Sequence, residues 1–311
     1  MNDPLAQVIG LLRPSASFSK LVTATGRWAV RPPGTEPFYG AVLDGECELS
    51  ITGCMPVRLS RGDFILIPAA HDFTMASPPP PPHGHLTEPV EVSPGVFHLG
   101  EPGAPDTRML IGHCAFGSHD AALLVSLLPN LVVTRGARRL TTLVELLSDE
   151  ARAGRPGRDV VLARLLEVLL IEAFRATTEP TAAPGLLRGL ADQRLAAALR
   201  RMHGEPTRAW TIGELAKEAA LSRSTFFDKF RREVGVAPME YLLGWRMAIA
   251  KDLLCGDGVS VGEVAQRVGY SSSSTFSVAF ARQVGASPTT YARRHERAIV
   301  GSTASAALAR P

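Results

Sequence analysis

Cysteine is scarce in this sequence, and the four cysteines present are scattered at positions 47, 54, 114 and 255. No two of them stand at Cys-x-x-Cys or zinc-ligand spacing. A disulfide framework or a structural zinc site needs cysteines at such spacings. The sequence therefore predicts neither, and we expect no cofactor.

The chain also lacks an apolar run as long as a membrane span, which takes about 20 residues. Its start, Met1 to Pro4, has neither the basic nor the apolar region of a signal peptide. The 311 residues are 45% hydrophobic and 20% charged, as in an ordinary globular protein of two domains. We expect a cytoplasmic protein with no membrane partner.

What the sequence does contain is one unit written twice between Trp210 and Tyr291. The matching positions are Thr211, Glu214, Ala216, Phe226, Phe230, Gly235, Pro238 and Tyr241 in the first copy and Ser260, Glu263, Ala265, Phe276, Phe280, Gly285, Pro288 and Tyr291 in the second. The offset is 49 residues before a serine-rich turn and 50 after it. Such a repeat indicates a supersecondary unit used twice.

Each copy has the pattern of a helix-turn-helix. Thr211 with Glu214, and Ser260 with Glu263, are capping-box pairs that start a short helix. The phenylalanines of the helix that follows are four residues apart, so they share one face and point inward. The opposite face of that second helix is the face that meets the DNA major groove in helix-turn-helix proteins.

This region resembles the DNA-binding domain of the AraC/XylS family of bacterial transcription regulators. The resemblance is carried by Val264, Ala265, Val268, Gly269, Tyr270, Ser271, Phe276, Phe280, Gly285, Ser287, Pro288 and Tyr291, with Gly235 and Pro238 in the first copy. It implies two helix-turn-helix units in successive major grooves of promoter DNA, acting on transcription by RNA polymerase. A linker helix from Pro238 to Leu254 would be about 25 Å long, and successive grooves on one face lie about 34 Å apart.

The charge is distributed as DNA binding requires. Residues 187–297 contain 17 basic and 11 acidic residues, whereas the rest of the chain contains 16 and 19. Neutralised phosphates release counterions and supply most of the sequence-independent affinity for DNA. The positive part of the chain is thus the part with the repeat.

Helix geometry and the resemblance together select the residues expected to meet DNA. The outward faces hold Arg223, Ser224, Phe227, Asp228 and Arg231 in the first copy and Ser273, Ser274, Ser277, Val278 and Ala281 in the second. The resemblance implies base contacts at Ser224, Phe227, Asp228, Ser274 and Val278, and the expected phosphate contacts are Arg223, Lys229, Arg232, Arg267 and Arg282. Asp228 either accepts from a cytosine amino group or only orients Arg231 or Arg232. The nearly uncharged second face favours readout of shape and phosphate over bases.

A short helix is expected at 3–12, and the chain from there to residue 115 has the pattern of short strands between turn signals. The expected strands are 26–30, 38–43, 46–51, 57–59, 63–67, 72–75, 95–98 and 108–115. Strands this short favour an antiparallel barrel or sandwich. The order of Phe38-Tyr39, Asp44-Gly45 and the run from Gly62 to Pro68 resembles the cupin-type sensor domain found before AraC-type DNA-binding domains. The predicted fold class is therefore α+β, a cupin-like β-barrel with flanking helices followed by an all-α tandem helix-turn-helix domain.

A metal site is not expected in this barrel, because no His-x-His pair lies on a strand. His83 and His85 follow a polyproline run, which favours loop residues over metal ligands. Barrels of this size can enclose a small molecule. The candidates to line an effector pocket are Trp28, Phe38, Tyr39, Phe64 and His71, with packed core as the alternative for each.

Leucine-rich helices are expected at 121–128, 140–152 and 157–175. They resemble the dimerisation element of the family, which implies a homodimer, or they only cover the barrel. The expected domains are residues 1–176 for sensing and 187–297 for DNA binding. Residues 177–186 would be a linker and 298–311 a disordered tail.

The sequence thus predicts a transcription regulator, not an enzyme, with an unidentified small-molecule effector. The alternative is a DNA-repair or other DNA-modifying protein with the same DNA-binding unit, in which Cys114 beside His113 is the candidate to accept an alkyl group. A redox role for Cys114 or Cys47 is a milder variant. An architectural DNA-binding protein is disfavoured, because it leaves the N-terminal domain without a role.

Overall fold

The computed structural model describes residues 3–32, 36–52, 55–69, 72–82, 85–118, 121–153, 155–176, 184–256 and 258–294. The chain forms two compact units. The sheet unit comprises Leu12–Gly117 and Leu128–Ala183, and the helical unit comprises Met1–Leu11, Ser118–Leu127 and Pro184–Pro311. This arrangement confirms the predicted α+β class. His71, His83, most of the expected linker and the whole expected tail lie outside the described residues.

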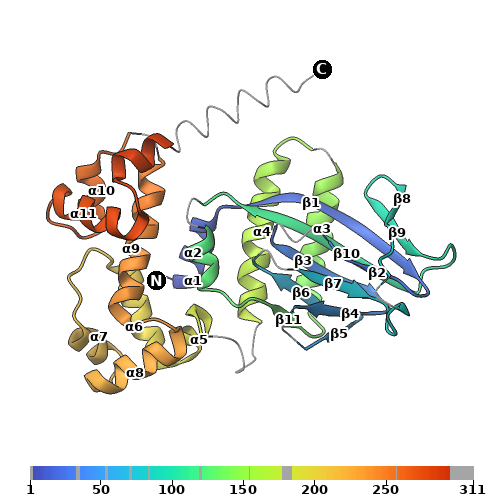
Figure 1. The fold of residues 1–311 in the computed structure, drawn as a ribbon, viewed down its shortest axis with the longest axis horizontal. Coiled ribbons are helices and arrows are strands. Elements are labelled where there is room, and N and C mark those ends of the chain that lie inside the picture. Colours follow the sequence, from blue (N-terminus) through green and yellow to red (C-terminus); the bar gives the residue numbers. More distant parts are fainter. Residues whose placement is uncertain are drawn as a thin grey trace. The chain divides into compact units, whose positions relative to one another are not determined.

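Two sheets make up the body of the sheet unit (Figure 1). The larger sheet has the order β11-β6-β3-β10-β1-β9-β8, with β1 (Pro14–Thr25), β3 (Phe38–Asp44), β6 (Phe64–Ile67), β8 (Val90–Ser93), β9 (Val96–Gly100), β10 (Thr107–Phe116) and β11 (Val132–Thr134). The smaller has the order β2-β7-β4-β5, with β2 (Ala29–Val30), β4 (Glu46–Ile51), β5 (Val57–Ser60) and β7 (Phe73–Ala76). Strand β1 pairs antiparallel with β10 and parallel with β9.

The core of this unit lies between the two sheets. Val22, Phe38, Ile65 and Met109 from the larger sheet pack in one cluster with Leu49 and other residues from the smaller. Side chains alternate along a strand, so neighbours of these residues point to the other face of the larger sheet. Helices α3 (Arg138–Ala153) and α4 (Arg158–Arg175) cover that sheet, α3 against β1, β3 and β10 and α4 against β1 and β11 (Figure 1).

Most of the expected strands are confirmed to within a few residues, but three were missed. These are β1, β8 and β11. The omission of β1 matters most, because it is the 12-residue strand that joins β10 to β9. Its sequence alternates serine with small or apolar residues between Pro14 and Ser19. This hydrophobic pattern is too weak to predict a central strand.

The helical unit consists of α1 (Pro4–Leu12), α2 (Ala121–Ser126), α5 (Leu186–Ala191), α6 (Gln193–Gly204), α7 (Ile212–Glu218), α8 (Arg223–Val234), α9 (Pro238–Leu254), α10 (Val261–Arg267), α11 (Ser273–Val284) and a last helical segment over 288–294. Helix α9 carries α7 and α8 at one end and α10 and α11 at the other (Figure 1). None of the helices in the described ranges is both long and apolar enough to cross a bilayer.

Two segments from early in the chain belong to this helical unit. In α1, Gln7 lies 2.9 Å from Nδ1 of His203 in α6. After α2, the carbonyl oxygen of Leu127 accepts from the backbone N–H of Leu186 at 2.9 Å. The prediction from sequence placed both segments in the barrel domain, because a short helix carries no local signal for a partner 59 or more residues away.

Candidate DNA-binding surface and effector cavity

The first helix-turn-helix forms as its sequence predicts. The Thr211 hydroxyl accepts from the Glu214 backbone N–H, and the Glu214 carboxylate accepts from the Thr211 backbone N–H at 2.9 Å, so the capping box at α7 is complete. Ser222 caps α8, where Phe226 and Phe230 are fully buried. Burying two such side chains stabilises the unit by several kcal/mol. The opposite face of α8 is left to solvent.

The residues of the first copy that are expected to contact DNA differ in their solvent exposure and in whether another side chain already pairs with them. Arg223, Ser224 and Asp228 are exposed, and Phe227 is partly so. The ammonium of Lys229 already forms an ion pair with the carboxylate of Asp192, the N-cap residue of α6. The guanidinium of Arg232 pairs with Glu233.

The second helix-turn-helix repeats this construction. Ser260 and Glu263 form the capping box of α10, Ser272 caps α11, and Phe276 and Phe280 are fully buried. Of the residues expected to contact DNA, Ser273, Ser274, Val278 and Arg282 on α11 are exposed and Ser277 is partly buried. Arg267 is exposed at the end of α10. The Ser277 hydroxyl donates to the Ser273 carbonyl oxygen at 2.7 Å.

Val278 is the most exposed apolar group on these two helices, with 72% of its surface accessible. An exposed apolar side chain among serines is the kind of group that can pack on a thymine methyl group. The face as a whole is nearly uncharged.

A brace fixes the two copies to each other. From α9, Arg246 donates to the carbonyl oxygens of Pro206 and Arg208 in the loop before α7, at 2.6 and 2.7 Å. At the turn of the second copy, Gly269 lies against the backbone of Thr207 in the same loop. Both the linker helix α9 and the second copy therefore contact this loop. These contacts hold α8 and α11, the second (reader) helix of each helix-turn-helix unit, in one arrangement.

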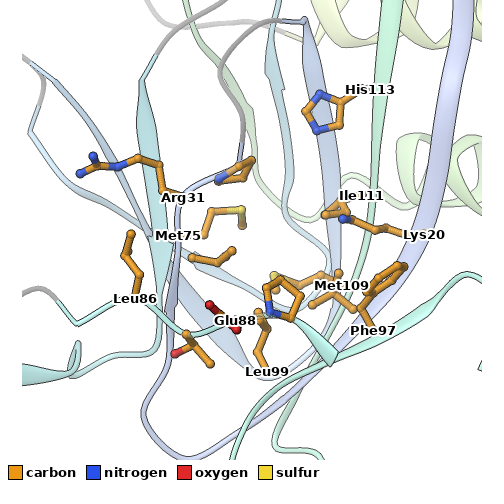
Figure 2. Close-up of a pocket in the computed structure, with 15 residues that line it drawn as sticks. Lys20, Arg31, Met75, Leu86, Glu88, Phe97, Leu99, Met109, Ile111 and His113 are labelled. Carbon is orange, nitrogen blue, oxygen red and sulfur yellow. The ribbon is translucent and has the colours of Figure 1, made fainter. Parts of the chain in front are cut away.

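The sheet unit contains a cavity of about 490 Å³. This lies within the range of sites that hold small molecules. The apolar side chains of the lining are Val22, Val30, Met75, Leu86, Phe97, Leu99, Met109 and Ile111, with Pro32 and Pro89. The polar ones are Lys20, Arg31, Thr87, Glu88 and His113. Figure 2 shows Lys20, Ile111 and His113 on one side of the cavity and Arg31 and Leu86 on the other.

Two titratable groups stand in the inner wall. Lys20 on β1 is half-buried, its ammonium lies 4.6 Å from the centre of the Phe97 ring, and burial lowers its pKa. His113 on β10 is 2% exposed, and burial lowers its pKa below the ordinary 6.5. His113 is therefore neutral at pH 7, and Lys20 supplies the positive charge of this wall.

Four of the residues predicted to line an effector pocket are described, and they do not line this cavity. Trp28 and Phe38 are fully buried in the cluster between the sheets. Tyr39 and Phe64 are also fully buried, next in sequence to Phe38 and Ile65 and so on the other face of the larger sheet. None of the four is in the lining described above. One signal in the sequence points to the lining of this cavity, because Lys20 is the only lysine before position 217.

Neither described barrel cysteine has the environment of a nucleophile. Cys47 and Cys114 are both fully buried, and burial is the main cause that raises each thiol pKa to about 12. Since the thiolate is the reactive form, neither residue suits alkyl transfer or redox sensing. The structure therefore gives no support to the DNA-modifying alternative at Cys114.

The sequence of this chain is similar to known families and proteins. The family described as Cupin matches residues 3–179, and the family described as Helix-turn-helix domain matches residues 215–294. A putative AraC-like transcription regulator of Streptomyces lividans is 35% identical over 94% of this chain and 98% of its own length. One of Streptomyces antibioticus is 34% identical over 94% and 99%. Among solved structures, the DNA-binding domain of AdpA, the global transcriptional factor, in complex with a target DNA is 31% identical over 34% of this chain and 95% of its own, with a TM-score of 0.32.

Proposed function

This chain belongs to the AraC-like transcription regulators, with an N-terminal cupin domain and a helix-turn-helix domain that binds DNA, and we propose that a small molecule in its cupin cavity controls promoter binding. The observation that carries the proposal is the pairing of two exposed reader helices with an apolar cavity of about 490 Å³ in the same chain. We assign sensing to residues 1–176 and DNA binding to residues 187–297. In the cytoplasm, the bound protein would act on RNA polymerase.

The path from cavity to DNA runs along two strands. Both β1 and β10 line the cavity, through Lys20 and Val22 on one and Met109, Ile111 and His113 on the other. Strand β1 follows α1 directly, and β10 leads to α2. Because α1 and α2 belong to the compact unit of the DNA-binding helices, a ligand that shifts either strand also shifts a segment packed in that unit. An effector acts when it favours one of two such states.

We assign base contacts to Ser224, Phe227 and Asp228 on α8 and to Ser274 and Val278 on α11. Phosphate contacts are assigned to Arg223, Arg267 and Arg282, which are all exposed. Ser273 and Ser277 complete the face of α11. Arg232 and Lys229 are the weaker candidates, because acidic neighbours already hold their charged groups.

We also propose that the protein forms a homodimer through α3 and α4. The outer surface of this helix pair exposes Leu146, Val160, Val161 and Val168. Val161 and Val168 are seven residues apart and share one face of α4. Apolar side chains repeated along one helix face are typical of a protein interface.

The test of the regulator function is chromatin immunoprecipitation of the tagged full-length protein, followed by binding of the purified chain to the recovered sites. We expect discrete peaks at promoters, preference over random duplex, and an affinity that falls steeply with salt. Diffuse occupancy without preference for any sequence would contradict the proposal and favour an architectural protein.

A further inference from the structure

The composition of the chain makes one residue of the cavity unusual. The sequence has four lysines among its 33 basic residues, at positions 20, 217, 229 and 251. Arginine is therefore the ordinary cation of this protein, and Lys20 is the only lysine in its first 216 residues. That single lysine lines the cavity.

A lysine suits this position because of its size. Its ammonium is a compact point charge, whereas a guanidinium is a wide planar fork that would fill part of the cavity. The Lys20 stem lies beside Ile111, its register partner on β10, and its ammonium lies 4.6 Å from the centre of the Phe97 ring. A charge in such apolar surroundings interacts with an opposite charge more strongly than it would in water.

His113 stands close enough to act with Lys20. In the register of β1 with β10, Lys20 faces Ile111, and His113 is two residues further along the same strand and on the same face. Both side chains line the cavity. Burial is the main cause that lowers the pKa of His113; the charge of Glu36 raises this pKa and the charge of Lys20 lowers it. A neutral imidazole can donate one hydrogen bond to an anion bound beside the ammonium.

The other two charges of the lining belong to the outer part of the cavity. Arg31 and Glu88 are both exposed and carry opposite signs. Lys20 is therefore the cation of the inner wall, while Glu36, outside the lining, acts on His113 with the opposite sign. Most of the remaining lining is apolar and includes the thioethers of Met75 and Met109. Flexible methionine side chains accommodate irregular apolar ligands.

We propose that the cavity binds a compact amphipathic organic acid, with its carboxylate held by the Lys20 ammonium and the His113 ring and its apolar body against Met75, Met109 and Leu99. This rests on the proposed function, since it names the chemical class of the effector. A charge-assisted hydrogen bond in a desolvated site discriminates strongly against a neutral analogue.

The test is calorimetric titration of the full-length chain with three naphthalene probes of one shape: 2-naphthoate, neutral 2-naphthamide and the 2-naphthylmethylammonium cation. We expect the wild-type protein to bind naphthoate at least about tenfold more tightly than naphthamide. Lys20→Gln removes this preference, and Lys20→Glu reverses it in favour of the cation. Such a reversal also shows that the variant is folded. Arg31→Gln, which removes a cation outside the inner wall, keeps the preference for naphthoate.

Equal affinity of the wild-type protein for naphthoate and naphthamide would overturn the inference, as would a preference that survives in Lys20→Gln. Binding of neither probe would overturn it too. The proposed function fails separately, because it is judged by promoter binding of the same preparation. Suppose that the chain binds its promoters and that naphthoate and naphthamide release it from them equally. The proposed function, control of promoter binding by a small molecule, would then stand, and only the inference that the effector is an acid would be wrong.

Discussion

Gly269 and Thr207 lie so close that a Cβ atom added to Gly269 would come within 2.5 Å of the Thr207 carbonyl oxygen. Gly269 is in the turn of the second helix-turn-helix, and Thr207 is in the loop before the first. The contact, together with Arg246, joins two repeats that the sequence separates by 49 residues. We propose that promoter recognition by both helices at once depends on this fixed arrangement.

Gly269→Ala is therefore expected to weaken promoter binding. Its φ of 85° costs a residue with a side chain about 1–2 kcal/mol, and the contact with Thr207 adds to that cost. Two other glycines serve as controls. Gly285→Ala has a strained φ of 78° but open space, and Gly262→Ala meets only the Ser260 hydroxyl oxygen, at 3.9 Å. The expected loss of affinity in a binding titration is largest for Gly269, smaller for Gly285 and negligible for Gly262, and equal losses would contradict the brace.

Arg223 and Lys229 are both on α8, and we expect them to differ in the salt dependence of promoter binding. Arg223→Ala should lower the slope of log affinity against log salt by about 1, because one phosphate contact is lost. Lys229→Ala should leave the slope unchanged and cost less than about 1 kcal/mol of folding free energy, since Lys229 pairs with Asp192. Titrations at several salt concentrations measure both slopes. The assignment is wrong if Lys229→Ala changes the slope as much as Arg223→Ala does.

His203 should make the helical unit sensitive to acid. His203 is 2% exposed, and its ring stacks on the Trp245 ring. The two ring nitrogens form hydrogen bonds with the Tyr241 hydroxyl and the Gln7 side chain. Burial lowers its pKa to about 3, whereas the unfolded chain keeps the ordinary value near 6.5. Between these values the unfolded state binds more protons, so the free energy of unfolding falls as pH falls below about 6.5, by up to about 1.4 kcal/mol per pH unit. Above 6.5 this group contributes no slope.

Urea unfolding between pH 4 and pH 7, followed by tryptophan fluorescence, measures this dependence. The control is His203→Leu, which cannot take up a proton. We expect a shallower pH dependence in the variant despite its lower stability at pH 7. Identical slopes for the two proteins would show that His203 takes up its proton without unfolding.

The double variant Val161→Asp, Val168→Asp should be monomeric if α4 forms the dimer interface. Both valines are 42% exposed in the single chain, so an aspartate is tolerated there in the monomer and repelled at the interface. Sedimentation analysis of the full-length protein measures the change in mass. Val92→Asp, at a 60% exposed valine on β8, is the matched control and should remain dimeric. A wild-type protein that sediments as a monomer would instead assign α3 and α4 to covering the sheet.

The two parts of the molecule were not equally predictable from sequence. Thr211 with Glu214 and Phe226 with Phe230 are signals between residues three or four apart, so both helix-turn-helix units could be located from the sequence. The cavity depends on β1, whose partners β9 and β10 lie about 75 to 100 residues further along the chain. Large aromatic residues such as Trp28 and Phe38 are fully buried in the core. The smaller and more flexible Met75 and Met109 line the cavity instead.

The brace between the two repeats could not have been predicted either. Gly269 matches the pattern of its family, but nothing in the sequence shows that it contacts Thr207, 62 positions earlier. Arg246 resembles any other basic residue of the linker helix until its two carbonyl partners are seen. Contacts of this kind arise from the packing of the whole unit and leave no local pattern.

The most direct test of the account is a hydroxyl-radical footprint of the full-length protein on a promoter recovered from cells. If α8 and α11 are held in one arrangement, they should protect two patches on one face of the duplex, about one helical turn apart. Asp228→Ala on α8 should weaken one patch and Val278→Ala on α11 the other. A single patch, or a footprint that neither variant alters, would contradict the claim that both helices enter the major groove.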